Sequence, residues 1–134
     1  MFDVTESPVG YAELQAELLG RWPENAIDPS LSRISAIMDL LGEPQRAYPV
    51  IQVTGTNGKS STARMIASLL RALGLRTGLY TSPHLVDMRE RIEIDGEPIS
   101  AQLFMQVAGD VAPFIATVDA RVDEEGGTPV TYFE

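Results

Sequence analysis

One short loop of the chain carries its single lysine and could do chemistry on a phosphate. The loop reads Gly55, Thr56, Asn57, Gly58, Lys59, Ser60 and Ser61. Glycines permit a tight turn whose backbone N–H groups converge on phosphate oxygens. Lys59 can reach the terminal phosphates as a positive charge, and Ser60 or Ser61 can offer a hydroxyl to Mg²⁺ or to a phosphate oxygen. The loop therefore predicts a site for nucleotide phosphates.

A simple glycine turn before an amphipathic helix would use the same glycines. We favour the phosphate site because a strand, Gly-Lys-Ser and a helix are expected in the required order. The ordinary P-loop spacing places glycine at position 53, where this chain has Val53, and Gly55 takes over that part. This departure argues against a simple P-loop kinase or phosphatase.

Two short apolar segments and one helix are expected to position the loop. Residues 49–53 and 77–81 resemble strands, and residues 58–73 carry apolar side chains at helical spacing. A strand, a helix and a strand within about thirty residues predict a βαβ unit with two adjacent parallel strands. The predicted fold class is α/β, a P-loop-type parallel sheet with flanking helices.

Capping residues suggest two helices before this unit. Ser7-Pro8 can open the first. Asp28 can cap the second, Pro29 fits its first turn, and Gly42 can close it.

Turn and capping residues also indicate the elements that follow. Residues 91–94 alternate like a strand, and Asp95-Gly96 is a hairpin signal. Ser100 can cap a long helix that Pro113 should kink or split. Residues 131–134 have the Thr-x-x-Glu spacing of a capping box.

The composition limits the possible partners. The net charge of −9 disfavours nucleic acid and anionic lipid as partners. The chain has no cysteine, which excludes disulfides and thiolate metal sites. We find neither a signal peptide nor an apolar run near the ~20 residues that span a bilayer. We therefore expect a cytoplasmic protein with no nucleic-acid or membrane partner.

The loop Gly-Thr-Asn-Gly-Lys at 55–59 resembles the P-loop of the Mur ligase superfamily, enzymes that make amide bonds through an acyl phosphate. Ser-Pro-His-Leu at 82–85 and Glu-Arg-Ile at 90–92 resemble its folylpolyglutamate synthase and dihydrofolate synthase branch. Residues 27–34 and 131–134 fit the same branch. Ser60 departs from it, because folate members often have glycine there.

The resemblance implies a full set of sites and partners. Lys59 would be the catalytic residue, and the ATP site would comprise Gly55, Thr56, Asn57, Gly58, Lys59, Ser60 and Ser61. Ser82 would be a ligand of the Mg²⁺ cofactor. The substrate site would comprise Asp28, Pro29, Ser30, Thr131, Tyr132, Phe133 and Glu134. The implied partners are ATP, L-glutamate and dihydropteroate or folate.

Structural roles remain open for several of these residues. Asp28 can be a helix cap, Thr131 and Glu134 a capping box, and Ser82 the cap of a turn before a proline. His84 has no second histidine or cysteine for a metal site, and we interpret it as a loop-positioning residue. Residues 89–91 either line a substrate loop or form a solvated strand edge.

The resemblance also bears on completeness. Residues 1–134 would be the N-terminal part of the ATP-binding Mur ligase central domain. The family's magnesium-binding glutamate and histidine, its carbamylated lysine and its C-terminal domain would lie outside this chain. We therefore expect this part to be inactive alone, and the complete enzyme to be a monomer. The alternatives are a Mur-type ligase acting on a peptidoglycan precursor and a nucleotide-binding module without ligase chemistry.

Overall fold

The computed structural model describes residues 10–21, 30–125 and 127–134 in two compact units. One unit takes in the described residues up to Pro49 together with those from Met105 to Glu134, and is called the helical unit here. The other is Val50–Phe104, called the loop–sheet unit.

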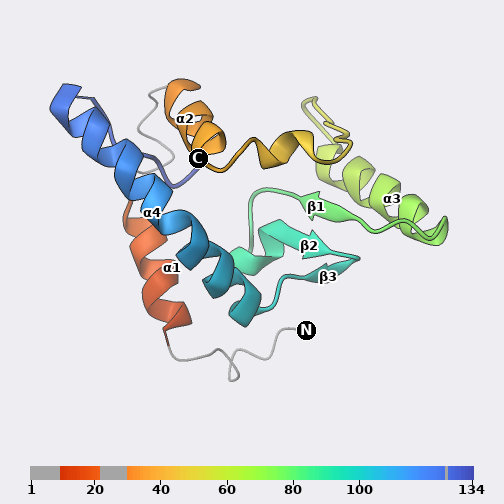
Figure 1. The fold of residues 1–134 in the computed structure, drawn as a ribbon. Coiled ribbons are helices and arrows are strands. Elements are labelled where there is room, and N and C mark those ends of the chain that lie inside the picture. Colours follow the sequence, from red (N-terminus) through yellow and green to blue (C-terminus); the bar gives the residue numbers. More distant parts are fainter. Residues whose placement is uncertain (1–9, 22–29, 126) are drawn as a thin grey trace. The chain divides into compact units, whose positions relative to one another are not determined.

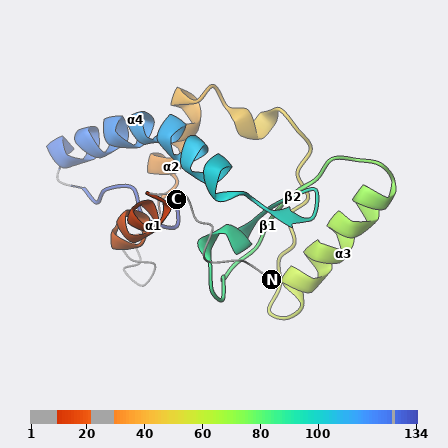
Figure 2. The same ribbon diagram turned by 90° about the horizontal axis from the view of Figure 1, so that it is seen from below.

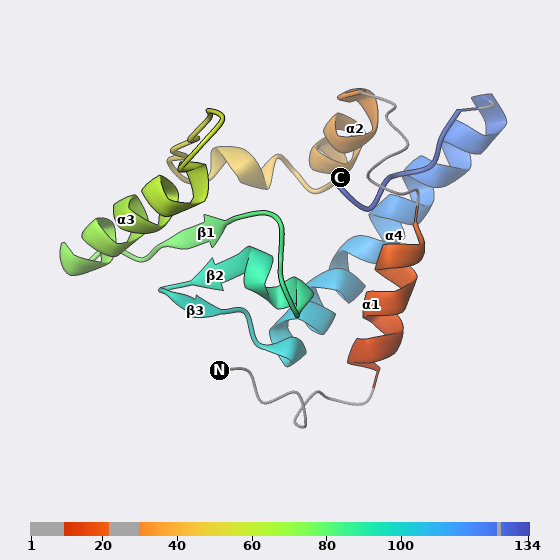
Figure 3. The same ribbon diagram turned by 180° about the vertical axis from the view of Figure 1, so that it is seen from behind.

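The helical unit is built from α1 (Tyr11–Gly20), α2 (Ser32–Leu40), the short 3₁₀ helix η2 (Pro44–Arg46) and most of α4 (Ala101–Glu125). Its buried core consists of Ile37 on α2, Val118 on α4 and Val130 beyond α4. Helix α1 lies beside α4 (Figures 1 and 3). The core thus joins α2 and α4 to the last described segment, residues 127–134.

Helix α2 closes as its glycine predicts. Gly42 has φ 76°, the left-handed conformation that glycine adopts at low cost. The Glu43 N–H donates to the Met38 carbonyl at 2.8 Å, and the Gly42 N–H donates to Asp39 at 3.1 Å. These two bonds form a Schellman motif, which satisfies carbonyls at the helix end. The expected openings at Ser7-Pro8 and at Asp28-Pro29 lie outside the described residues.

Helix α4 begins at its predicted cap and continues through its proline. Ser100 Oγ accepts the Leu103 N–H at 3.1 Å, as expected for a capping serine. Of the two predicted effects of Pro113, a kink or a split, the split is wrong, because α4 is one continuous helix (Figure 2). Proline removes one helical hydrogen bond, whereas the packing of Ile115 and Val118 in the core holds the turn that follows.

Among the described residues, α4 is long and apolar enough over Ala101–Val122 to cross a bilayer by length and composition alone. The expectation that no segment comes near this length was therefore wrong. Asp119 of this helix forms an ion pair with Arg21 and accepts the Val130 N–H. The helix therefore supplies a carboxylate to the polar contacts of its own unit.

The loop–sheet unit contains α3 (Lys59–Ala72), β1 (Gly78–Tyr80), the 3₁₀ helix η3 (Met88–Arg91), β2 (Ile92–Ile94) and β3 (Glu97–Pro98). The strands form one antiparallel sheet in the order β1-β2-β3 (Figure 3). Asp95 and Gly96 join β2 to β3 with φ 52° and 90°. Two positive φ values are typical of the type I′ turn, so the hairpin prediction is confirmed.

The predicted parallel pair is absent from the described residues. Residues 50–53 form no strand, and β1 pairs with β2 in the antiparallel direction instead. Parallel strands need cover on both faces, yet Val50 and Ile51 are 68% and 62% exposed. The two-residue turn Asp95-Gly96 pairs β2 with β3, whereas residues 81–91 separate β1 from β2 in the chain. The α/β class itself stands, with a helix at residues 59–72 as predicted, apart from its end residues.

Candidate functional site

The glycine-bearing loop leads into α3 with its backbone donors uncovered. Gly55 and Gly58 have φ 146° and 72°, in the region that favours glycine. Gly58 is the N-cap of α3, and no side chain caps this end. The helix's own bonding starts at the Thr62 N–H, which donates to the Gly58 carbonyl at 2.9 Å. The N–H groups of the first turn therefore remain available to an anion.

Lys59 stands at this helix start with its charge exposed. Its Nζ donates to the Thr56 carbonyl at 3.4 Å, a long contact for an N–H···O bond. Ser60 and Ser61 beside it are also exposed. The loop thus combines a lysine, two hydroxyls and a helix dipole at one point, which is an arrangement able to bind phosphates.

The predicted metal residue lies in the loop after β1. Ser82 is exposed and joined to Pro83 by a cis peptide bond. The buried Thr81 before it donates its N–H to the Arg91 carbonyl at 2.9 Å. No group of three or more His, Cys, Asp or Glu side chains that could hold a metal occurs in the described part of the chain.

The same loop is held from within by Glu90. Its carboxylate accepts the backbone N–H groups of Leu85, Val86 and Asp87 at 2.8, 3.0 and 2.9 Å. The bonds from Leu85 and Asp87 are the main cause that holds the pKa of Glu90 below its ordinary value. Asp87 and Glu90 form a capping box on η3. Their Asp-x-x-Glu spacing was a signal that our reading of the sequence missed.

Two arginines form side-chain hydrogen bonds to residues of the same loop. Arg91 Nε donates to His84 Nδ1 at 2.8 Å, which agrees with His84 as a loop-positioning residue. Arg89 donates to both carboxylate oxygens of Asp87 at 3.0 and 2.7 Å. Both arginines are buried, so the alternative of a solvated strand edge is wrong. Burial follows because η3 turns these side chains inward before β2 begins.

The predicted substrate residues occur in the helical unit. Asp28 and Pro29 lie outside the described residues. Ser30 Oγ accepts the Ser32 N–H at 3.1 Å at the start of α2. Thr131 and Glu134 form the expected reciprocal contacts, with the Thr131 N–H to Glu134 Oε2 at 2.9 Å and the Glu134 N–H to Thr131 Oγ1 at 3.2 Å. The reciprocal contacts of a capping box are thereby confirmed, but the helix start expected at residues 131–134 is not, because these residues form no helix.

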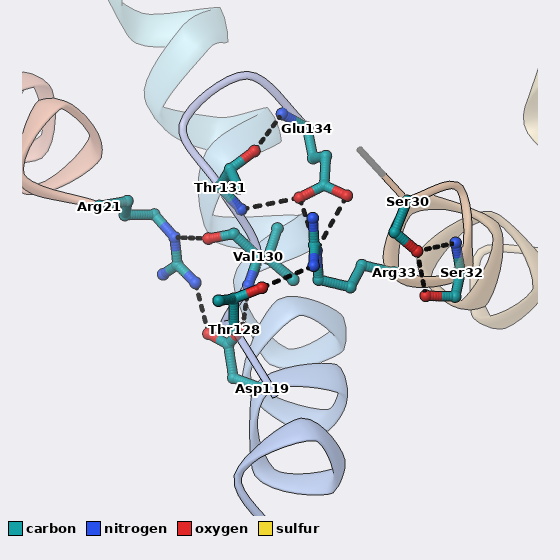
Figure 4. A network of polar contacts seen from close by, with 9 residues as sticks. All are labelled: Arg21, Ser30, Ser32, Arg33, Asp119, Thr128, Val130, Thr131 and Glu134. Carbon is teal, nitrogen blue, oxygen red and sulfur yellow. Dashed lines mark hydrogen bonds and ion pairs between the residues drawn. The ribbon is translucent and has the colours of Figure 1, made fainter. Parts of the chain in front are cut away.

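A residue that our reading did not single out joins these two segments. Arg33 Nε of α2 lies 2.9 and 3.1 Å from the two carboxylate oxygens of Glu134, 101 residues away in the chain (Figure 4). Arg33 Nη1 also donates to Thr128 Oγ1 at 2.8 Å. No local pattern in the sequence predicts this contact, because only the fold brings residues so distant together.

Residues 127–134 are fixed at a second point. Arg21 Nε donates to the Val130 carbonyl at 3.0 Å, and Asp119 accepts the Val130 N–H at 2.7 Å (Figure 4). Arg21 and Asp119 are themselves an ion pair. The predicted ATP and metal residues thus all belong to the loop–sheet unit, and the described substrate residues all belong to the helical unit.

The uncapped α3 behind a Gly-Lys-Ser loop, in an α/β arrangement, is typical of proteins that bind nucleotide phosphates. No family model matches the chain. The dihydrofolate synthase/folylpolyglutamate synthase of Mycobacterium tuberculosis is 51% identical over 117 residues, covering 85% of this chain and 24% of that protein. The folylpolyglutamate synthase of Lacticaseibacillus casei is 41% identical over 102 residues, covering 76% of this chain and 23% of that protein.

Solved structures agree with the sequence comparison. A folylpolyglutamate synthase of M. tuberculosis complexed with ADP and AMPPCP matches with a TM-score of 0.84 and 43% identity, covering 92% of this chain and 26% of that one. A folylpolyglutamate synthase–AMPPCP–folate complex matches with a TM-score of 0.79 and 36% identity, covering 92% of this chain and 29% of that one. The chain belongs to the folylpolyglutamate synthase and dihydrofolate synthase family and corresponds to its N-terminal part. It spans about a quarter of the length of these relatives.

Proposed function

We propose that the chain is the N-terminal, nucleotide-binding part of an ATP-dependent ligase that adds L-glutamate to dihydropteroate, to a reduced folate, or to both. The observation that carries this proposal is the uncapped N-terminus of α3 behind the Gly55–Gly58 turn, with Lys59 exposed beside it. The names of the relatives supply the ligase class and the folate substrate. The enzyme works in the cytoplasm as a monomer.

The proposed ATP site has a clear division of roles. The N–H groups of Lys59, Ser60 and Ser61 and the turn formed by Gly55, Thr56, Asn57 and Gly58 surround the phosphates. Lys59 places its charge at the β- and γ-phosphates, where negative charge grows during transfer. The hydroxyls of Ser60 and Ser61 offer further contacts to phosphate oxygens.

The proposed reaction has two steps. A carboxylate oxygen of the acceptor attacks the γ-phosphorus of ATP, and the bond to the bridging oxygen breaks to release ADP. The amine nitrogen of L-glutamate then attacks the carbonyl carbon of the acyl phosphate. Phosphate leaves with the bonding electrons, and the new amide nitrogen loses a proton to solvent. The protein contributes positioning and neutralisation of charge, chiefly through Lys59 and the α3 donors.

The loop–sheet unit offers one of the ligands that Mg²⁺ would need. Ser82 offers an exposed hydroxyl oxygen, a hard donor of the kind that Mg²⁺ accepts. Phosphate oxygens, water, and the glutamate and histidine that the family resemblance places outside this chain would supply the other ligands. When bound, Mg²⁺ supplies positive charge to the phosphates of ATP.

The acceptor is proposed to meet the helical unit at two segments. Asp28, Pro29 and Ser30 form one by resemblance to the family. Thr131, Tyr132, Phe133 and Glu134 form the other. The Phe133 ring is 65% exposed and is suited to contact a flat aromatic acceptor.

The decisive test is ligation by the complete purified protein. We expect ATP-dependent incorporation of labelled glutamate into dihydropteroate or tetrahydrofolate, with release of phosphate and ADP. Residues 1–134 alone should show no ligation. Activity with a UDP-muramoyl peptide precursor and with neither pteridine acceptor would overturn the assignment in favour of another Mur-type ligase. Nucleotide binding without any ligation would favour a non-catalytic module.

A further inference from the structure

The buried guanidinium of Arg33 joins two segments far apart in the sequence. We infer that Arg33 is a positioning residue of the acceptor site, which holds residues 131–134 in place against the start of α2. This inference rests on the proposed function, because it takes both segments to meet the acceptor.

The contact is built to fix geometry. The side chains of Arg33 and Glu134 are 6% and 9% exposed. Arg33 Nε reaches both oxygens of the Glu134 carboxylate, and Nη1 reaches Thr128 Oγ1 (Figure 4). A planar guanidinium with several fixed donors constrains the orientation of its partner more than a flexible ammonium does.

The Glu134 carboxylate is occupied within the chain. Its two oxygens meet Arg33, and Oε2 also accepts the Thr131 N–H at 2.9 Å. The carboxylate therefore serves to shape the turn over residues 131–134, while Phe133 in that turn stays 65% exposed. Arg33 thus fixes the turn that presents the exposed ring.

The other end of the contact is close to the second acceptor segment. Arg33 is the second residue of α2, and Ser30 Oγ accepts the N–H of Ser32, the first. Moving the α2 start relative to residues 131–134 would therefore change the spacing between Ser30 and Phe133. Displacements of about 1 Å in a binding geometry can lower a rate by ~10²-fold.

This role predicts a selective kinetic effect. In the complete protein, Arg33→Met should raise the KM for the pteridine acceptor about tenfold or more, while the KM for ATP stays within about twofold. The ATP value is spared because the predicted ATP residues belong to the loop–sheet unit. Arg33→Lys keeps the charge but not the planar fork, so its acceptor KM should fall between those of the wild type and Arg33→Met.

Two arginine variants serve as matched controls. Arg46→Met removes an ion pair to Glu43 near the other end of α2, where the Arg46 side chain is 74% exposed, and should leave both KM values unchanged. Arg21→Met removes the contacts to Val130 and Asp119 but leaves the Arg33–Glu134 contact in place, so it should lower the melting temperature while the acceptor KM stays within about twofold. Melting temperatures of all variants separate a loss of stability from a loss of position.

A variant of Thr128 keeps the test decisive if Arg33→Met does not fold. Thr128→Val removes one acceptor of the Arg33 guanidinium and keeps the side-chain shape. It should raise the acceptor KM about threefold at an unchanged ATP KM, a smaller effect than that of Arg33→Met because Glu134 still holds the guanidinium. An unchanged acceptor KM in both Thr128→Val and Arg33→Lys would overturn the inference.

Three further results would contradict the positioning role of Arg33. An active wild type whose Arg33→Met variant keeps its acceptor KM overturns the positioning role alone. The positioning role is also overturned if the acceptor KM rises in proportion to the loss of melting temperature, with the same proportion in Arg21→Met and Arg33→Met. A wild type that neither binds nor ligates either acceptor overturns the proposed function and the inference with it.

Discussion

Replacing Lys59 should separate an effect on folding stability from an effect on the rate of ligation. Within the described structure, its Nζ contacts the Thr56 carbonyl at 3.4 Å, and its side chain is exposed. Replacing an exposed side chain with so weak a contact should change the free energy of unfolding by about 0.5 kcal/mol or less. Lys59→Met should therefore fold like the wild type.

The expected loss of activity is much larger. Removing one preorganised charge or donor from a transition state costs ~10²–10³ in kcat, or about 2.7–4 kcal/mol. We expect Lys59→Met to lose at least this factor in ATP-dependent ligation, because in the proposed ATP site the lysine faces the charge that moves to the leaving group. The assay is steady-state ligation by the complete protein, beside a thermal melt of the same preparations.

A second exposed cation provides the control for Lys59. Arg76 lies in the same unit with its side chain 88% exposed, 3.3 Å from Asp95. Arg76→Met removes the same formal charge, so it should keep kcat and the KM for ATP within about twofold. Ligation by Lys59→Met within about tenfold of the wild type would refute the reasoning. An equal loss in Arg76→Met would show that net charge, rather than the loop, governs the rate.

Three other predictions concern the fold, all measured on the complete protein. The lowered pKa of Glu90 implies stability that is present above the ordinary pKa of a glutamate and is lost as the pH falls through the lowered pKa. Glu90→Gln should therefore make hydrogen exchange at residues 85–87 less sensitive to acid. An unchanged pH profile of exchange would contradict this prediction. Ile37→Ala should lower the free energy of unfolding by about 2–5 kcal/mol in a denaturant melt, because Ile37 is 3% exposed. Leu31→Ala, at an 80% exposed position, should change it little. Equal losses in the two variants would argue against this core. Gly96→Ala should lower the free energy of unfolding by about 1–2 kcal/mol, because the residue has φ 90° and the added Cβ would lie 2.8 Å from the Arg71 guanidinium. A melting curve that matches the wild type would count against the type I′ turn.

Local signals in the sequence were sufficient for elements that local chemistry decides. Asp95-Gly96 predicted a hairpin, because these two residue types tolerate the positive φ values of a type I′ turn. Gly42 and Ser100 predicted one helix end and one helix start, because a left-handed glycine and a capping hydroxyl satisfy backbone groups within a few residues. The Gly-Lys-Ser loop was located for the same reason.

Such local signals did not predict which segments pair as strands. The apolar residues 50–53 predicted a parallel strand, yet a strand forms only where neighbours supply its hydrogen bonds and cover its faces. Val50 and Ile51 are mostly exposed, and β1 pairs with β2 instead. Burial of Arg89 and Arg91 was equally unforeseen, since the direction in which η3 turns decides it.

By itself the sequence determined the Gly-Lys-Ser loop, the helix that follows it and the capping-box contacts of residues 131–134, because each depends on residues within one or two turns. The tertiary structure alone decided that Arg33 meets Glu134, 101 residues away. A buried ion pair depends on which surfaces the fold brings together, because each charge is tolerated out of water only beside its partner. That dependence is the physical reason why the loop could be predicted from the sequence and the frame of the acceptor segments could not.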